Sequence, residues 1–322
     1  MKYMKLLLVF LISSLSIMSW TMNNWLMIWY LMDICLILFM GICGSSGGYS
    51  TSESMMKYYL IQVSFSLIML VFMFFYILNL GFLFSIVLMV GLLVKMGMFP
   101  FHFWLVLICG KLEWTSFYVL STLMKLIPLM LLYYLFSISS FFFVVASSTV
   151  FGGLMGLNNG VIQKMIVYSS MVNICWFLYS LSISLILFWF YFTSYICMLG
   201  WLMNLLSKHK IFYINQFSFN HISLASKVMM LIYSLSIAGF PPFLGFMIKW
   251  MVINYLWYFG LKILISLMIL FSLLAVYYYL QMFFFIMVVF SSWMKWYTIN
   301  LTKFGWLSFM FLMSYLGLFL FY

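Results

Sequence analysis

The chain has 322 residues, of which 68% are hydrophobic and only 5% charged, and its formal net charge is +11. A soluble domain carries about 25% charged residues, so this composition excludes a soluble globular protein and indicates a membrane protein. Three acids, three histidines and five cysteines without a CxxC motif provide no convincing haem, iron–sulfur or zinc site. We therefore expect no metal and no cofactor in this chain.

The predicted elements are apolar helices, because a spanning helix needs about 20 mostly apolar residues and nearly the whole sequence divides into such segments. The first segment imitates a secretory signal peptide, but no small-residue cleavage site follows it, so we interpret it as a span. The fourth segment is long and the tenth is longer still, so either could tilt or project beyond the lipid. In chain order, the predicted spans are 5–20, 25–43, 57–78, 80–104, 115–136, 139–157, 164–182, 184–206, 227–253, 262–290 and 304–322.

These spans predict an all-α polytopic membrane protein with eleven transmembrane helices, built as a single transmembrane domain over residues 1–322 with no soluble domain. Non-translocated loops collect lysine and arginine, and the lysines outside the spans are distributed very unequally. Only Lys262 falls on the side away from the N-terminus. The N-terminal side has Lys2, Lys5, Lys57, Lys111, Lys164, Lys208, Lys210, Lys227, Lys295 and Lys303.

This asymmetry places the N-terminus inside and the C-terminus outside. The positive net charge therefore reflects topology, and it implies no nucleic-acid partner. Glu53 and Glu113 fall in inside loops, where we expect water to solvate them.

Four ionisable residues fall inside predicted spans, namely Asp33, Lys95, Lys125 and Lys249. Each charge at the centre of a span costs about 2.5–3.5 kcal/mol on insertion scales, so these groups must be paired, neutral or hydrated. A structural ion pair with Asp33, or snorkelling of Lys249 from its helix end, would be a simpler explanation. One carboxylate cannot neutralise three lysines, however, and Lys125 lies too deep to reach water easily.

Ionisable groups inside membranes usually form proton relays. Desolvation destabilises the charged form of a lysine, which brings its proton within reach of exchange near neutral pH, and a nearby carboxylate opposes this effect. A carboxylate whose influence changes would switch such a lysine between holding and releasing a proton. The intramembrane charges therefore favour ion or proton transport.

Three prolines strengthen this hypothesis, because proline breaks the helical hydrogen-bond ladder and the freed groups must face protein or water. Pro100 interrupts or ends the fourth helix, and Pro241 and Pro242 interrupt the ninth, with residues 240–243 expected to be unwound. Each of these helices has a lysine five to eight residues from its proline. The two helices lie five apart, which is the offset of inverted five-helix repeats in transporters.

His102 follows Pro100 by two residues near the inside surface. It could pass protons inward to Lys95. It could equally form a hydrogen bond at the helix end.

Several segments resemble a known family. They are "STSESMMKYYLIQVSFS", "KMGMFPFHFWLV", "LMKLIPLMLL", "GGLMGLNNGVIQKMIVYSSMVNICW" and "GFPPFLGFMIKW". They are similar to motifs of the subunit 2 family of NADH-ubiquinone oxidoreductase, the antiporter-like membrane subunits of respiratory complex I. The second and the last segments are the most specific.

The resemblance implies roles for the four intramembrane charges. Asp33 would be the carboxylate partner, Lys95 its switching lysine, Lys125 the central relay and Lys249 the lysine toward the exit side. The family usually has Glu where Asp33 stands, so a shorter side chain must reach Lys95 here or use water. The Pro-Glu pair that usually follows "FHFW" in the family is absent, which removes an acid near the inside mouth.

The resemblance also implies that the chain translocates protons across the mitochondrial inner membrane, with its N-terminus in the matrix and its C-terminus in the intermembrane space. Other subunits would oxidise NADH and reduce ubiquinone, so this chain would bind neither a redox cofactor nor a soluble small-molecule substrate. Its partners would be the other membrane-arm subunits of complex I and membrane lipids. A free-standing cation/proton antiporter would need more intramembrane acid, and a scaffold would not need three deep lysines beside broken helices.

Overall fold

The computed structural model describes residues 2–45, 48–77, 82–135, 138–218, 224–241 and 243–293, and these form helices joined by short connections. They belong to two compact units, residues 1–144 and 145–322, which we describe separately. Helices dominate because a backbone in lipid must satisfy its hydrogen bonds within its own segment. The prediction of an all-α protein is confirmed, whereas the prediction of a single transmembrane domain stays a prediction.

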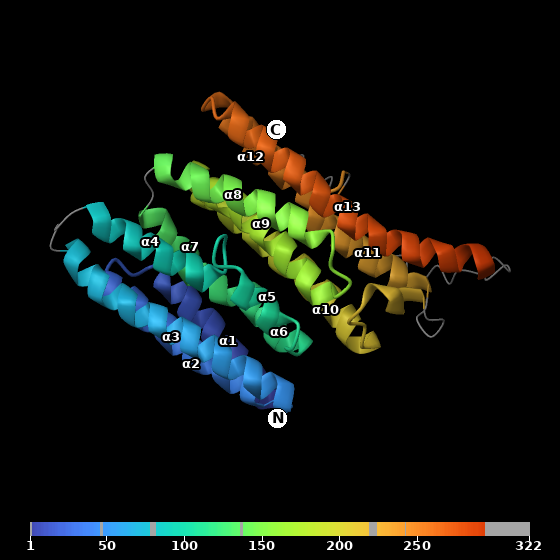
Figure 1. Cartoon of the computed structure of the whole chain (residues 1–322), viewed down its shortest axis with the longest axis horizontal. Coiled ribbons are helices and arrows are strands. Elements are labelled where there is room, and N and C mark those ends of the chain that lie inside the picture. The colour runs from blue at the N-terminus through green and yellow to red at the C-terminus, as the bar shows by residue number, and fades with distance from the viewer. Residues whose placement is uncertain are drawn as a thin grey trace. The chain divides into compact units, whose positions relative to one another are not determined.

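The first unit is a helical bundle in which α2 lies between α1 and α3, while α7 packs against α1, α2, α4 and α6 (Figure 1). This arrangement places the middle of α2 and the end of α4 beside the start of α7. The elements are α1 (Lys2–Ser19), α2 (Trp25–Gly44), α3 (Tyr49–Ile77), α4 (Phe82–Met96), α5 (Phe103–Cys109), α6 (Trp114–Ser121) and α7 (Leu123–Tyr134).

The second unit is organised around α9, whose side chains are almost all buried because α10, α12 and α13 pack against it. The boundary between the units falls within α8 (Ile138–Gly156), whose residues from Val145 onward belong to this unit. The other elements are α9 (Ile162–Ile183), α10 (Leu185–His209), the 3-10 helix η1 (Ile214–Ser218), α11 (Leu224–Ala238), α12 (Leu244–Tyr258) and α13 (Lys262–Trp293).

Ten of the eleven predicted spans coincide with helices, and the eleventh, 304–322, lies outside the described residues. Within the described part, six segments are long and apolar enough to cross a membrane, with α6 and α7 taken together, and shorter apolar helices accompany them. Three predicted spans are interrupted, namely 80–104, 115–136 and 227–253. The extra length of 80–104 reflects a break between α4 and α5, so tilt or projection is not its explanation.

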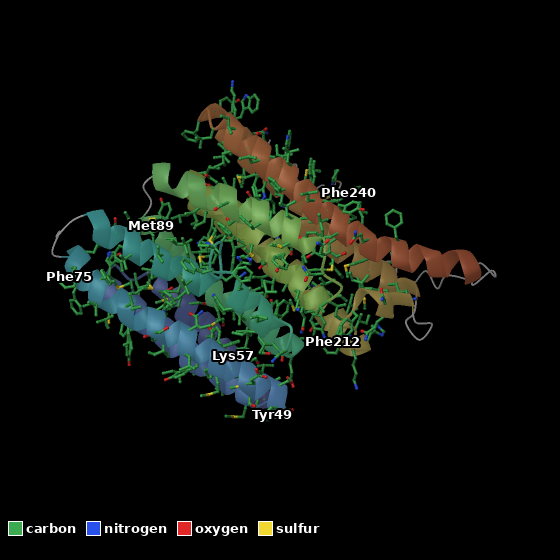
Figure 2. All side chains as sticks on the ribbon, viewed as in Figure 1. Tyr49, Lys57, Phe75, Met89, Phe212 and Phe240 are labelled. Carbon is green, nitrogen blue, oxygen red and sulfur yellow. The ribbon has the colours of Figure 1, made fainter. Side chains whose placement is uncertain are left out.

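Ion pairs gather the ends of several helices at one end of the first unit. Lys5 Nζ lies 2.8 Å from Glu113 Oε2, and Glu53 contacts both Lys57 (2.5 Å) and Lys111 (2.8 Å). Figure 2 shows Lys57 near Tyr49 at this end of α3, with Phe75 at the other end. The two acids are exposed, as expected, but they are paired with lysines and not simply solvated.

Exposed ion pairs such as these contribute little stability. They are informative here because they show which helix ends lie together. All three lysines belong to the set that the sequence assigned to the inside surface. The structure brings them to a common end, as that assignment requires.

A similar junction lies at one end of the second unit. Ile162 N donates to Phe212 O (2.9 Å) and Ile214 N donates to Gly160 O (3.1 Å), so the α8–α9 and α10–η1 connections run side by side. Lys164, Lys208 and Lys210, which were also assigned to the inside surface, lie on or next to these connections. Within each unit, the positions of these lysines therefore agree with the predicted alternation of the spans.

Candidate functional site

Asp33 and Lys95 form an ion pair inside the first unit. Asp33 projects from the middle of α2 and Lys95 from the last turn of α4, and Lys95 Nζ lies 3.5 Å from Asp33 Oδ1. The Lys95 side chain is only 2% exposed, whereas that of Asp33 is 26% exposed. The shorter acid therefore reaches the lysine directly, at the outer limit of a hydrogen bond.

The end of α4 is set by Gly97, whose φ of +67° is a left-handed conformation that suits glycine. Gly97 N donates to Val94 O and Met98 N to Leu93 O, both at 3.0 Å, which is a Schellman motif. A Cβ at position 97 would lie 2.8 Å from Leu105 Cδ1. The predicted interruption near Pro100 is confirmed, but the helix ends three residues before the proline, at a glycine.

Two side chains cover the last carbonyls of α4, which have no partner within the helix. Trp104 Nε1 donates to Val94 O (3.0 Å), and Gln62 Nε2 lies 3.4 Å from Lys95 O. The turn that presents Lys95 is therefore held by neighbouring elements.

Lys125 is buried near the start of α7, just after a break that the sequence did not predict. Thr122 has φ −118° and ψ −80°, which separates α6 from α7. The hydroxyls of Ser121 and Thr122 both donate to Tyr118 O, at 3.1 and 2.7 Å, and back-bonding of this kind bends helices. A Ser-Thr pair three residues before the lysine was the available signal.

Pro128 lies inside α7. It has no N–H to donate to the carbonyl of Met124, four residues earlier. The backbone around Lys125 is thus irregular on both sides, which in a membrane requires protein or water to satisfy the freed groups.

Lys95 and Lys125 line the same cavity. The space open to the centre of a water molecule is about 20 Å³, and one water needs roughly 10–15 Å³ by this measure. Met124 and Pro128 also line it, so the irregular backbone of α7 borders the same space. The cavity therefore has room for a water molecule in a space that two buried lysines line.

Tyr58 and Gln62, which the sequence analysis did not single out, also line this cavity. They lie four residues apart on α3 and so share one face of the helix. The Tyr58 ring packs against Phe39 (5.0 Å between centroids) and Trp104 (5.9 Å). Two polar residues at helical spacing within an apolar span were the signal that could have identified them.

Lys249 belongs to the second unit and lies beside its broken helix. Helix α11 ends at Ala238, where Gly239 has φ +86° and Phe240 N donates to Leu235 O at 3.0 Å. The chain becomes helical again at Leu244. Residues 239–241 and 243 are non-helical, which confirms the predicted unwound stretch at 240, 241 and 243, while Pro242 lies outside the described residues.

The side chain of Lys249 turns back into this break. Its Nζ donates to Ala238 O at 2.7 Å and lies 5.8 Å from the ring centroid of Trp176. A Cβ at Gly239 would lie 2.9 Å from Lys249 Cδ. Lys249 is 5% exposed, so this geometry does not favour snorkelling toward the C-terminal end of α12.

His102 directly precedes α5, and its ring lies 4.2 Å from that of Phe103 and 6.0 Å from that of Phe99. The residue is buried. A role in proton entry stays a prediction.

The same local arrangement occurs once in each unit. In each, a helix ends at a glycine with positive φ, a proline follows two or three residues later, and a buried lysine lies at the break. The prediction of discontinuous helices is confirmed. The inverted relation between the repeats stays a prediction.

Sequence comparison finds a family and several relatives. A model of the family described as "NADH:quinone oxidoreductase/Mrp antiporter, TM" matches residues 22–275. NADH-ubiquinone oxidoreductase chain 2 of Aedes aegypti is 35% identical over 241 residues, which cover 72% of this chain and 71% of the relative. The protein of the same name from Anopheles gambiae is 33% identical with the same coverage.

Solved structures also resemble the chain. A chain of respiratory complex I from Thermus thermophilus superposes with a TM-score of 0.73 at 20% identity, covering 81% of this chain and 65% of that one. A chain of the Mrp complex from Dietzia sp. gives 0.74 at 14% identity, covering 86% and 59%. This chain thus spans less than two thirds of either solved chain. At these identities the likeness establishes the fold, which is that of antiporter-like membrane subunits.

Proposed function

Because this chain belongs to the chain 2 family of NADH-ubiquinone oxidoreductase, within the wider NADH:quinone oxidoreductase/Mrp antiporter family, we propose that it translocates protons as an antiporter-like subunit of complex I. It would do so as a multi-pass protein of the mitochondrial inner membrane, in contact with other membrane-arm subunits and with lipid. NADH oxidation and ubiquinone reduction would take place in those other subunits. This chain would contribute no redox step and hold no cofactor.

The observation that carries this proposal is the cavity shared by Lys95 and Lys125. A cavity that has room for water and is lined by two buried lysines supports proton transfer from one lysine to the other through that water. Neither lysine needs to reach bulk solvent for the transfer. An ion pair with a purely structural role would explain Asp33 and Lys95, but it would not explain a second lysine on the same cavity.

Asp33 acts in this proposal as the group that controls Lys95. While its carboxylate remains close, it stabilises the ammonium form of Lys95. When that influence weakens, Lys95 gives a proton to the water in the cavity as the water gives one of its protons to the neutral amine of Lys125. The carboxylate therefore decides when the transfer occurs.

Lys249 would act at the break in the second unit. The unwound backbone offers carbonyl groups to the amine and to water, which lowers the cost of a charge at membrane depth. The hydrogen bond from Lys249 Nζ to Ala238 O supports this role. Orientation of the chain, with its N-terminus in the matrix, belongs to the same proposal and rests on the distribution of lysines.

The proposal is tested by Lys125→Met and Lys249→Met, each of which keeps an unbranched apolar stem and removes the titratable amine. We expect the complex to assemble and its rate of proton translocation to fall by about tenfold or more, because a positioned proton-transfer group contributes at least that much. The measurement is quenching of a pH-sensitive dye by purified complex I in sealed vesicles supplied with NADH and ubiquinone.

Lys111→Met is the matched control, because Lys111 is an exposed lysine of the first unit, and it should leave the rate unchanged. Normal rates in both test variants would contradict the proposal and leave a scaffold as the explanation. A normal rate in Lys249→Met alone would reduce Lys249 to an anchoring residue.

A further inference from the structure

A second cavity lies in the second unit, beside the broken helix. The space open to the centre of a water molecule is about 10 Å³, which is close to the roughly 10–15 Å³ that one water requires and too small for a larger ligand. It is lined by Tyr191, Ser194 and Tyr195 on α10, by Ser236 on α11, by Gly245 at the start of α12 and otherwise by apolar residues.

The hydroxyl of Tyr191 identifies what this cavity binds. Tyr191 is 4% exposed, and its hydroxyl has no hydrogen-bond partner among the residues that the structure describes. Another buried tyrosine of the same unit, Tyr279, has its hydroxyl 2.7 Å from Ser169 Oγ. Buried polar groups are normally paired with protein or with ordered water. Because Tyr191 lines the cavity, the cavity is the space in which a partner for its hydroxyl can lie.

The two serine hydroxyls can accept hydrogen bonds from a ligand in the cavity. Ser194 Oγ donates to Tyr191 O and Ser236 Oγ donates to Tyr233 O, both at 2.7 Å. Each serine oxygen therefore keeps lone pairs that can accept a hydrogen bond. A ligand that accepts from Tyr191 and donates to serine oxygens, within the volume of one small molecule, is water.

The position of the cavity relates it to Lys249. Gly245, which lines the cavity, and Lys249, which does not, lie four residues apart and so share one face of α12. Ser236 lies two residues before Ala238, whose carbonyl accepts from Lys249 Nζ. A Cβ at Gly245 would lie 1.8 Å from Ser236 O, so glycine is what allows α12 to approach α11 closely at this point.

We propose that this cavity binds one water molecule, held by the Tyr191 hydroxyl, and that this water receives the proton released by Lys249. The inference rests on the proposed function, and it adds Tyr191 as a positioning residue. In the step, the Lys249 side chain first turns from Ala238 O toward the cavity. Its ammonium then gives one proton to the water oxygen while the water gives one of its own protons to the next water on the outward path. Lys249 is left neutral and the bound water is regenerated.

The test is Tyr191→Phe, which removes only the hydroxyl, measured in purified complex I. We expect ordered water density in the cavity of the parent complex by high-resolution electron cryo-microscopy and none in the variant. We also expect proton translocation per complex to fall by roughly tenfold. Tyr279→Phe is the matched control, because it removes a buried hydroxyl of the same unit away from the cavity, and it should leave both readouts unchanged.

A parent complex without water in the cavity would overturn the inference, and so would a Tyr191→Phe complex that pumps normally. A normal rate for Tyr191→Phe beside a lost rate for Lys249→Met would reject the water and retain the proposed function. Normal rates in both would reject the water and reduce Lys249 to an anchoring residue, and only a normal rate in Lys125→Met as well would reject the proposed function itself. If Tyr191→Phe fails to assemble, the density in the parent complex and the rate of Ser194→Ala decide, with a lowered rate expected for the serine variant.

Discussion

Asp33 stands where the resemblance to the family leads us to expect the longer Glu. The ion pair nevertheless forms, at 3.5 Å between Lys95 Nζ and Asp33 Oδ1. A distance at the outer limit of hydrogen bonding suits a contact that must weaken during a cycle. The short acid is thus compatible with the role of a switch.

The first prediction follows from this distance. Asp33→Asn removes the charge that stabilises the Lys95 ammonium while keeping the size of the side chain, so proton translocation should fall by about tenfold or more. Asp33→Glu should retain most of the rate, because the added methylene lets the carboxylate come closer to Lys95. Dye quenching in sealed vesicles measures both, and full pumping by the Asn variant would remove Asp33 from the mechanism.

At the scale of the element, the breaks in the helices rest on glycine more than on proline. Gly97 and Gly239 both have positive φ, and both end a helix before the proline that follows. Proline then prevents the helix from continuing, since it cannot donate to the ladder. The lysine at each break is therefore presented by a C-terminal turn whose conformation glycine permits.

The second prediction concerns Gly239→Ala. A side chain at φ +86° is strained by about 1–3 kcal/mol, and the new Cβ would also lie 2.9 Å from Lys249 Cδ. The variant should lower the thermal stability of the purified complex and should also slow proton translocation, because Lys249 must move.

Gly260→Ala provides the matched control for this prediction. Gly260 has a similar φ of +74°, but a Cβ there would meet nothing within 4 Å. It should therefore share the backbone strain without disturbing Lys249. Equal proton-translocation rates in the two alanine variants would mean that the close approach of Gly239 and Lys249 is not required for proton translocation.

At the scale of the whole molecule, lysines that the sequence assigned to the inside surface lie together at one end of each unit. Lys5, Lys57 and Lys111 meet acids at one end of the first unit, and Lys164 lies beside the paired connections at one end of the second. The orientation of these ends in the membrane stays a prediction from the positive-inside rule.

The third prediction tests that orientation. Lys57→Cys should react with a membrane-impermeant maleimide in inside-out vesicles, where the matrix side is exposed, and should be protected in mitoplasts. Lys262→Cys should show the opposite pattern, because it is the lysine assigned to the other side. Labelling of both residues from one side would refute the predicted eleven-helix topology, as would finding Tyr322 in the matrix.

The sequence by itself determined where the helices lie and which residues are unusual within them. Apolar runs of spanning length identified ten segments that are helical or nearly so, because in lipid the backbone has few alternatives to helix. Asp33, Lys95, Lys125 and Lys249 stood out because each is costly at membrane depth. The break at Thr122 was missed, because serine and threonine are common in apolar helices and only their hydrogen bonds to Tyr118 O show that the helix bends there.

Only the tertiary structure decided which of these residues meet. Asp33, Tyr58, Lys95 and Lys125 come from four different helices, and helical periodicity gives the face of a residue without naming the helix that the face will meet. The contact from Lys249 to Ala238 O spans eleven residues across a break, so no regular spacing encodes it. Cavities are likewise a property of how side chains from several helices fill space, which is why the water site beside Tyr191 could emerge only from the folded chain.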